Sequence, residues 1–124
     1  MAHLLVIDDE ILIRDAIEIM LEHDGHTADL AEDGAAGMEM FNQGNFDLVI
    51  SDIFMPVKNG FEVLSEIKNI NSLMNVLILS GGHQDTDLND SLGKAKILGA
   101  DEVLSKPFAH TDLSEKVNQL LKLG

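Results

Sequence analysis

The sequence FDLVISDIFMPVKNG, residues 46–60, decides the fold. Its aliphatic run at 48–50 is typical of a strand buried on both faces of a parallel sheet. Asp52 follows where that run ends. Pro56 disfavours helical angles at the residue before it, and Gly60 opens an amphipathic segment, so the residues between are predicted to form a loop at the carboxyl end of the strand. In open α/β sheets, ligands bind at that edge.

Similar apolar runs recur along the chain and alternate with segments of helical periodicity. The expected strands are 4–7, a weaker strand at 26–31 near an edge, 48–50, 76–79 and 102–105. The expected helices have apolar faces within 13–21, 36–41, 61–67, 92–98 and 113–121, with turns at 69–75 and a polar loop at 83–90. Asp112 and Glu115 have capping-box spacing for the last helix, with Thr111 as a competing cap. Five strands alternating with five helices predict a parallel, right-handedly wound sheet covered on both faces.

The composition fits one acidic domain. The chain has 124 residues, of which 22 are acidic and eight are Lys or Arg, and its net charge of −14 argues against direct binding to nucleic acid. It has no cysteine for a disulfide or a thiolate metal site. No apolar run reaches membrane-spanning length and the N-terminus lacks a secretory pattern, so we expect a cytoplasmic protein without membrane insertion.

Polar side chains stand at the ends of four predicted strands. They are Asp8 and Asp9, Asp52, Ser80 and Lys106. Each residue alone is more commonly a turn, cap or surface residue. Because the carboxyl ends of parallel strands meet at one edge of the sheet, we expect these side chains to converge, and their joint placement favours a functional site.

The chemistry of this set points to a metal ion. Two carboxylates about 4 Å apart repel each other by roughly 4 kcal/mol at an effective dielectric of 20, which a proton or a cation relieves. Oxygen ligands without cysteine or histidine favour Mg²⁺. The expected ligands are Asp8, Asp9, Asp52 and the backbone carbonyl of Phe54.

A carboxylate in such a site can attack phosphorus and form an aspartyl phosphate. Asp52 is the expected nucleophile because it ends the central strand. Ser80 is expected to donate a hydrogen bond to a phosphoryl oxygen, and Lys106 to pair with another.

The five histidines stand apart from this set. His23 and His26 flank a predicted helix end, while His3, His83 and His110 lie elsewhere. None has the spacing of a metal-ligand set, so the sequence predicts five solvated side chains.

With these residues placed, the chain resembles a response-regulator receiver domain, the phosphoacceptor of two-component signalling, over essentially all of its length. The resemblance rests on VIDDE at 6–10, DIFMP at 52–56 with Gly60, SG at 80–81, GAD at 99–101 and KPF at 106–108. It implies a (βα)5 flavodoxin-like fold with strand order 2-1-3-4-5. We therefore expect residues 1–124 to form one receiver domain, and no output domain is visible within them.

The resemblance further implies that Asp52 accepts a phosphoryl group from a histidine kinase or a phosphotransfer protein. Asp9 is expected to bind Mg²⁺ directly, Asp8 mainly through water, and the Lys106–Pro107 bond is expected to be cis. Such a domain takes part in its own phosphorylation and dephosphorylation but is not a multiple-turnover enzyme. Its surface toward an unknown output protein would comprise the fourth helix, fifth strand and fifth helix, roughly residues 88–123.

Two features depart from the family pattern. The stretch from Ser80 to Lys106 is a few residues longer than usual, and we place the extra length in the polar loop at 83–90. The switch position, usually Tyr or Phe, is Val103, which is at odds with the usual ring-rotation mechanism.

Three other functions are alternatives to a receiver domain. A phosphorylation-independent binding module is favoured only by Val103. A Mg²⁺-dependent phosphatase of the haloacid-dehalogenase type would need Asp-x-Asp after the first strand, where this chain has DDE at 8–10. A flavin-binding flavodoxin would need a Ser/Thr- and Gly-rich phosphate loop after the first strand and a Trp or Tyr to stack on the flavin, and this sequence has neither.

Overall fold

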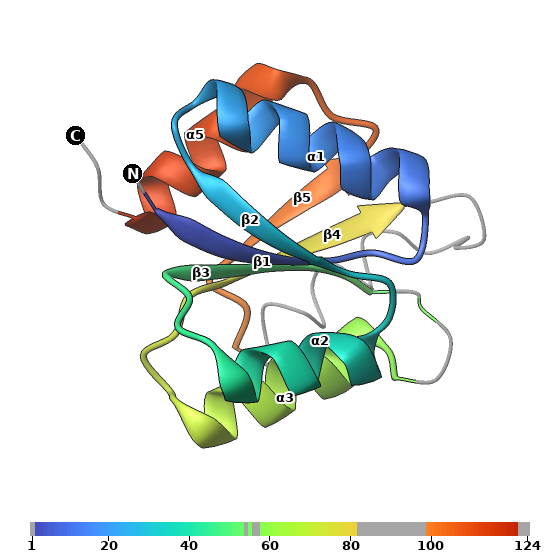
Figure 1. Cartoon of the computed structure of the whole chain (residues 1–124), viewed down its shortest axis with the longest axis vertical. Helices are drawn as coiled ribbons and strands as arrows, with labels where there is room; N and C mark the ends of the chain where they lie inside the picture. Colours follow the sequence, from blue (N-terminus) through green and yellow to red (C-terminus); the bar gives the residue numbers. More distant parts are fainter. Residues whose placement is uncertain (1, 54, 56–57, 82–98, 122–124) are drawn as a thin grey trace.

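Five parallel strands form the centre of the protein in a computed structural model, which describes residues 2–53, 55, 58–81 and 99–121. The strands are β1 (His3–Ile7), β2 (Thr27–Ala31), β3 (Leu48–Asp52), β4 (Val76–Gly81) and β5 (Glu102–Lys106). Their order in the sheet is β2-β1-β3-β4-β5, as Figure 1 shows. The predicted parallel sheet and the flavodoxin-like strand order are therefore confirmed.

Helices cover both faces of this sheet. They are α1 (Ile11–His23), α2 (Gly34–Gln43), α3 (Gly60–Ile70) and α5 (His110–Leu121). Figure 1 shows α1 and α5 together on one face, and α2 and α3 on the other. The helix predicted within 92–98 and the polar loop predicted at 83–90 lie outside the described residues.

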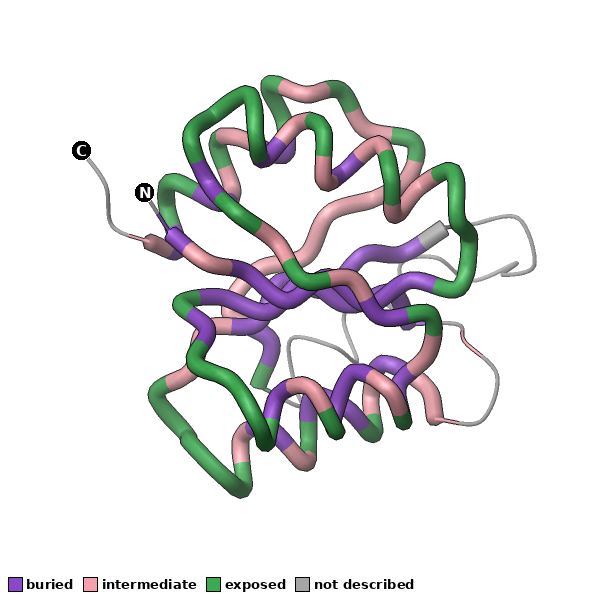
Figure 2. The backbone as a smooth tube through the Cα atoms, in the orientation of Figure 1, coloured by how far each residue is buried: buried purple, intermediate pink, exposed green. Residues whose placement is uncertain are grey.

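The core has two halves because side chains alternate across each strand. Along β1, Leu5 and Ile7 pack into the cluster on the side of α2 and α3. Leu4 and Val6 pack into the cluster on the side of α1 and α5. Figure 2 shows the buried residues concentrated along the central strands. The apolar runs seen in the sequence are thus buried on both faces, which holds the strand ends in place.

Some predicted boundaries were wrong. The edge strand β2 begins at Thr27 and not at residue 26, and α3 continues through Ile70 instead of ending before the predicted turn at 69–75. The backbone N–H of Ala109 donates a hydrogen bond to Asp112 Oδ2 at 2.9 Å. Because α5 begins at His110, Asp112 lies within its first turn, and the predicted capping box is absent at this end of the described helix.

The start of α3 is held against the end of β3. The N–H of Gly60 donates to the carbonyl oxygen of Ile53 at 2.8 Å. A Cβ atom at Gly60 would lie 2.3 Å from the carbonyl oxygen of Asp52, so only glycine fits this close approach. A capping box between Asn59 and Glu62 completes the helix start. The start of α3 therefore packs directly against the backbone of Asp52.

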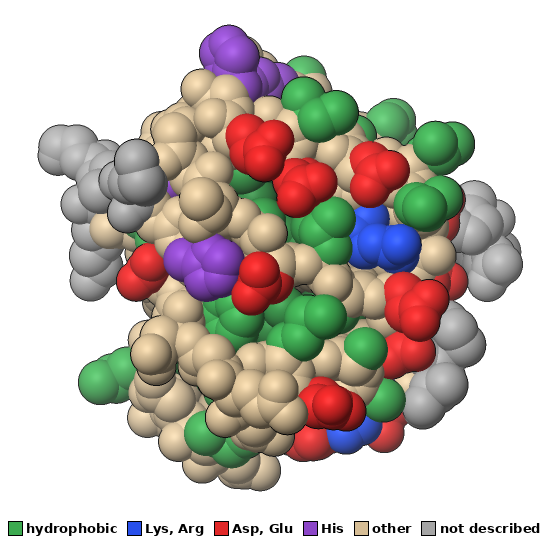
Figure 3. All heavy atoms as spheres, viewed as in Figure 1, with side chains coloured by type: hydrophobic (Ala, Val, Ile, Leu, Met, Phe, Trp, Pro, Cys, Tyr) green, Lys and Arg blue, Asp and Glu red, His purple; other side chains and the backbone are tan. Residues whose placement is uncertain are grey.

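Acidic side chains outnumber basic ones in this chain, 22 against eight. Figure 3 shows acidic side chains spread over the drawn face, with basic side chains in only a few places. Within the described part of the chain, none of the helices has the length and apolar character needed to cross a lipid bilayer.

Candidate functional site

The predicted polar residues stand at one edge of the sheet. Asp8 and Asp9 follow β1, Asp52 is the last residue of β3, and Lys106 is the last residue of β5. Ser80 lies within β4, which extends two residues further than predicted. The strand register places Asp52 beside Leu79, so Ser80 lies one residue beyond the level of Asp52 in the neighbouring strand.

Four carboxylates gather at this edge, and we call them the acid cluster: Asp8, Asp9, Glu10 and Asp52. One oxygen from each lies within 4.8 Å of those of the others. Asp8 and Asp52 are buried, whereas Asp9 and Glu10 are exposed. Glu10 was not among the predicted site residues, although its position next to the Asp8–Asp9 pair was a signal for it.

Lys106 supplies a cation to the acid cluster. Its Nζ lies 2.8 Å from Asp8 Oδ2, 3.3 Å from Asp52 Oδ2 and 3.5 Å from Glu10 Oε1. The lysine side chain is only 9% exposed, so these contacts are weakly screened by water. The predicted convergence of Lys106 with the carboxylates is observed, and the Lys106–Pro107 bond is cis as expected.

Backbone N–H groups orient the two buried carboxylates. Ile53 N–H donates to Asp52 Oδ1 at 2.9 Å, and Glu10 N–H donates to Asp8 Oδ1 at 2.9 Å. The second oxygen of each carboxylate is the one that faces Lys106. The Asp52 side chain is therefore held in one orientation before any ligand arrives.

The electrostatics of the site raise the pKa of Asp52 towards neutral pH. Burial raises the pKa of Asp52 to about 6, repulsion from Asp8 adds to this rise, and Lys106 opposes it. Burial also raises the pKa of Asp8, against the hydrogen bond from Lys106. Burial lowers the pKa of Lys106, but its carboxylate partners outweigh burial and raise it overall. One lysine thus only partly balances the cluster, which retains affinity for a proton or a cation.

The hydroxyl of Ser80 is buried without a hydrogen-bond partner among the described residues. Buried polar atoms are normally paired, so an unpaired one calls for an explanation such as an absent ligand. The neighbouring strand shows the ordinary case, because Ser51 Oγ donates to the carbonyl oxygen of Asp52 at 3.0 Å. Phe54 lies outside the described residues, and its carbonyl as a metal ligand stays a prediction.

The prediction of five solvated histidines was wrong for His26 and is confirmed for His23, whose side chain is 78% exposed. His26 is only 4% exposed, and its Nδ1 accepts a hydrogen bond from the backbone N–H of Ala2 at 3.1 Å. His3 and His110 each bond to an aspartate carboxylate. These partners lie 24 to 86 positions away, so local spacing carried no signal for them. His83 lies outside the described residues.

Comparison with known proteins agrees with this geometry. The sequence matches the response regulator receiver domain family over residues 4–118. It is 34% identical over 114 residues to the transcriptional regulatory protein DltR of Streptococcus agalactiae, covering 92% of this chain and 49% of DltR. It is 31% identical over 117 residues to the chemotaxis protein CheY of Halobacterium salinarum, covering 94% of each. The chain thus spans about half the length of DltR and nearly all of CheY.

A solved structure supports the same assignment. The response regulator TrrA from Thermotoga maritima, in complex with Mg²⁺ and BeF, superposes with a TM-score of 0.81 at 35% sequence identity. The match covers 97% of this chain and 99% of TrrA. The acid cluster with Lys106, the strand order and these matches lead to one conclusion: the chain belongs to the response regulator receiver domain family of two-component signalling.

Proposed function

We propose that this receiver domain accepts a phosphoryl group on Asp52 from a histidine kinase or a phosphotransfer protein in a Mg²⁺-dependent reaction. The observation that carries the proposal is the position of Lys106 Nζ, 3.3 Å from Asp52 Oδ2, within the acid cluster at the carboxyl edge of the sheet. A buried carboxylate beside a lysine and further carboxylates is the arrangement that phosphoryl transfer to aspartate requires.

In the proposed step, a carboxylate oxygen of Asp52 attacks the phosphorus of a phosphohistidine. The new O–P bond forms as the P–N bond breaks. The imidazole leaves with the electron pair of the P–N bond, and its nitrogen then binds a proton. Asp52 must be ionised to attack, and at pH 7 it is mostly ionised because its pKa is about 6. Lys106 would pair with one phosphoryl oxygen, and the hydroxyl of Ser80, which has no partner in the described part of the chain, would donate to another.

The donor atoms of the acid cluster fit Mg²⁺. They are carboxylate oxygens close enough to share one ion, and hard oxygen ligands are what Mg²⁺ prefers. Asp8, Asp9 and Asp52 would hold the ion, with the backbone carbonyl of Phe54 as the expected further ligand. When bound, Mg²⁺ supplies positive charge that neutralises the phosphoryl oxygens. The complex of TrrA with Mg²⁺ and BeF supports this choice of ion.

The domain would act as a phosphoacceptor and not as a multiple-turnover enzyme. Its phosphorylated form would signal to an output protein through roughly residues 88–123, of which β5 and α5 are described. The family match favours this function over the phosphatase and flavodoxin alternatives. A binding module that works without phosphorylation has only Val103 in its favour, because the acids and the lysine of the site are all present.

Intact-mass spectrometry with a small phosphodonor such as acetyl phosphate tests the proposal. We expect one added phosphoryl group in the wild type with Mg²⁺, and none after chelation of the metal or in Asp52→Asn. Asp15→Asn is a matched control, because Asp15 is an exposed acid of α1 outside the acid cluster, and this variant should be phosphorylated normally. Phosphorylation of Asp52→Asn, or phosphorylation without a divalent cation, would contradict the proposal.

A further inference from the structure

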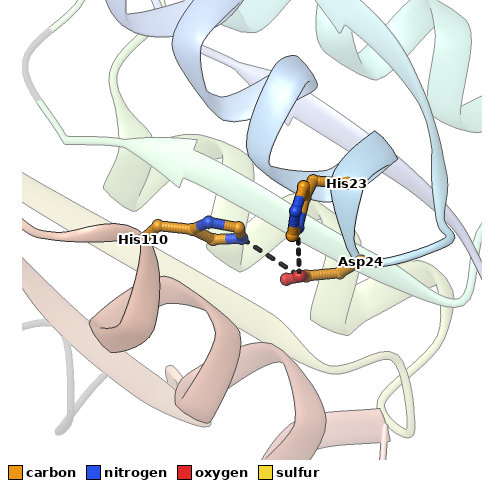
Figure 4. A group of neighbouring side chains, drawn as sticks. All are labelled: His23, Asp24 and His110. Atoms are coloured by element: carbon orange, nitrogen blue, oxygen red, sulfur yellow. Dashed lines mark hydrogen bonds and ion pairs between the residues drawn. The ribbon is translucent and has the colours of Figure 1, made fainter.

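Three side chains with metal-binding atoms meet where α1 ends and α5 begins. We call them the histidine cluster: His23, Asp24 and His110. His110 Nε2 lies 3.0 Å from Asp24 Oδ1, and His23 Nδ1 lies 3.5 Å from the same oxygen. All three ligand atoms lie within 4.8 Å of one another. Figure 4 shows both imidazole rings directed at the carboxylate from different helices.

We propose that the histidine cluster binds a divalent transition-metal ion of the Zn²⁺ type. Zinc bonds of about 2.0–2.2 Å in a tetrahedral site place neighbouring donor atoms about 3.3 Å apart. The observed separations of 3.0 and 3.5 Å lie on either side of that value. The rings are nearly perpendicular, with an angle of 82° between their planes, so they can approach one ion from two directions. Small side-chain adjustments would therefore complete the site.

Asp24 is prepared to act as a ligand. Ser114 Oγ donates a hydrogen bond to Asp24 Oδ2, which orients the carboxylate and leaves Oδ1 toward the two histidines. This hydrogen bond from Ser114 lowers the pKa of Asp24, and His110 and His23 lower it further, so the carboxylate is ionised at neutral pH. Hydrogen bonds of this kind to a ligating carboxylate are typical of protein metal sites.

The end of α1 favours a cation here. Asp24 caps the C-terminus of α1, and Gly25 follows with a φ of 90°, which turns the chain away from the helix axis. The C-terminal end of a helix carries partial negative charge that attracts cations, whereas the N-terminal end of α5 carries partial positive charge and offsets part of this effect. His110 is the first residue of α5, so an ion bound here would link the ends of two helices on the same face of the sheet.

The histidine cluster differs from the acid cluster in metal preference. The acid cluster offers only carboxylate oxygens, which suit Mg²⁺, whereas two imidazoles and one carboxylate suit Zn²⁺ and its neighbours. His23 is 78% exposed and His110 is 35% exposed, which leaves room for water in the remaining coordination position. The proposal does not depend on phosphorylation of Asp52, and the two can be tested separately.

Calorimetric titration with Zn²⁺ tests the site, with Mg²⁺ in excess to occupy the acid cluster. We expect the wild type to bind one Zn²⁺ ion at the histidine cluster. His23→Gln and His110→Gln should each weaken binding at least tenfold, since even an outer partner of a metal ligand is worth about 10–100-fold in affinity. His3→Gln and Asp9→Asn are the controls and should bind Zn²⁺ as the wild type does, because His3 and Asp9 lie outside the histidine cluster.

Two further measurements check that the variants are folded and locate the bound Zn²⁺ ion. Circular dichroism checks that each variant is folded, and His23→Gln is the safer variant because its side chain is mostly exposed. Imidazole NMR signals of His23 and His110 should shift on addition of Zn²⁺, while those of His3 should not. Absence of Zn²⁺ binding, equal binding by the folded His23→Gln variant, or loss of binding in Asp9→Asn would overturn the proposal.

Discussion

Lys106 Nζ lies 2.8 Å from Asp8 Oδ2, although the two residues are 98 positions apart in the sequence. β1 and β5 are not neighbours, since β3 and β4 separate them in the sheet. The contact therefore spans the carboxyl edge of the sheet and brings the last strand into the acid cluster. It also places the lysine closer to Asp8 than to Asp52. Phosphorylation of Asp52 would give this lysine a new anionic partner.

Removing this cation should destabilise the protein. In Lys106→Met, the fully buried Asp8 loses its charged partner, and breaking such a buried pair costs about 3–5 kcal/mol of unfolding free energy. Urea denaturation at pH 7 without divalent metal measures the change. Lys116→Met is the control, because Lys116 pairs with Glu102 at 2.9 Å but is 32% exposed, and such pairs contribute about 0–1 kcal/mol. Equal losses in the two variants would contradict the account.

Asp52→Asn should stabilise the metal-free protein, and more so as the pH rises. The pKa of Asp52 is raised from 3.8 to about 6 in the folded state. Between about pH 4 and pH 6 the folded protein therefore binds more protons than the unfolded chain, so this group lowers stability as the pH rises through that window. Asparagine does not titrate, and it can still accept the hydrogen bond from Ile53.

The expected stability gain of Asp52→Asn over the wild type is about 1–3 kcal/mol at pH 7, at 1.4 kcal/mol per pKa unit, and close to zero near pH 4. Urea melts across this range measure it. Asp24→Asn should show the opposite sign, because hydrogen bonds from Ser114 and its other partners lower the pKa of Asp24. A gain for Asp52→Asn that does not change with pH would show that burial does not raise the pKa of Asp52.

Ser80→Ala should slow phosphorylation while leaving the unfolding free energy nearly unchanged. Because Ser80 Oγ has no partner among the described residues, its removal should change the unfolding free energy by less than about 0.5 kcal/mol or raise it slightly. Loss of the donor should slow phosphorylation by about tenfold or more. Ser51→Ala is the matched control, since it loses a buried hydrogen bond worth about 1 kcal/mol. A large loss of stability in Ser80→Ala would mean that the hydroxyl has a structural role.

Val103 is expected to stay in place when the domain is activated. It lies on β5 beside Ile78 of β4 and packs against the core on the side of α2 and α3. A β-branched side chain has few rotamers and cannot act as a swinging ring. Methyl NMR with Mg²⁺ and beryllofluoride should therefore show small shifts for Val103 and larger ones for Ile53, whose backbone N–H binds Asp52. Larger shifts at Val103 than at Ile53 would contradict this.

Hydrogen exchange complements that experiment. We expect the largest protection change on activation over residues 81–98, because Ser80 would be drawn to the phosphoryl group and this segment follows it directly. Residues 82–98 lie outside the described part of the chain. Changes confined to β5 and α5 would show that another element reports activation.

The sheet and the acid cluster were predictable because local signals determine both. Apolar runs such as 48–50 identify strands, and parallel strands must end at one edge, which brings Asp8, Asp52 and Lys106 together. The start of α5 was mispredicted because several polar residues at 110–115 compete as caps, and the helix begins before the pair with capping-box spacing.

Contacts between distant residues that do not stand at strand ends, and the atoms that touch within a predicted cluster, could not be predicted. The histidine cluster joins Asp24 to His110, 86 positions away. No sequence motif near either residue predicts this contact. Whether Lys106 would lie closer to Asp8 or to Asp52 depends on the reach of side chains from separate strands. Sequence patterns place residues on an edge of the sheet, but they do not determine which atoms touch.

Locating the phosphoryl group tests the central claim most directly. An aspartyl phosphate can be reduced with borohydride, which marks the modified residue, and tandem mass spectrometry then identifies it. The wild type treated with phosphodonor and Mg²⁺ should carry the mark on Asp52. A mark on Asp8 or Asp9, or no mark above that of untreated protein, would contradict the assignment of Asp52 as the phosphoacceptor.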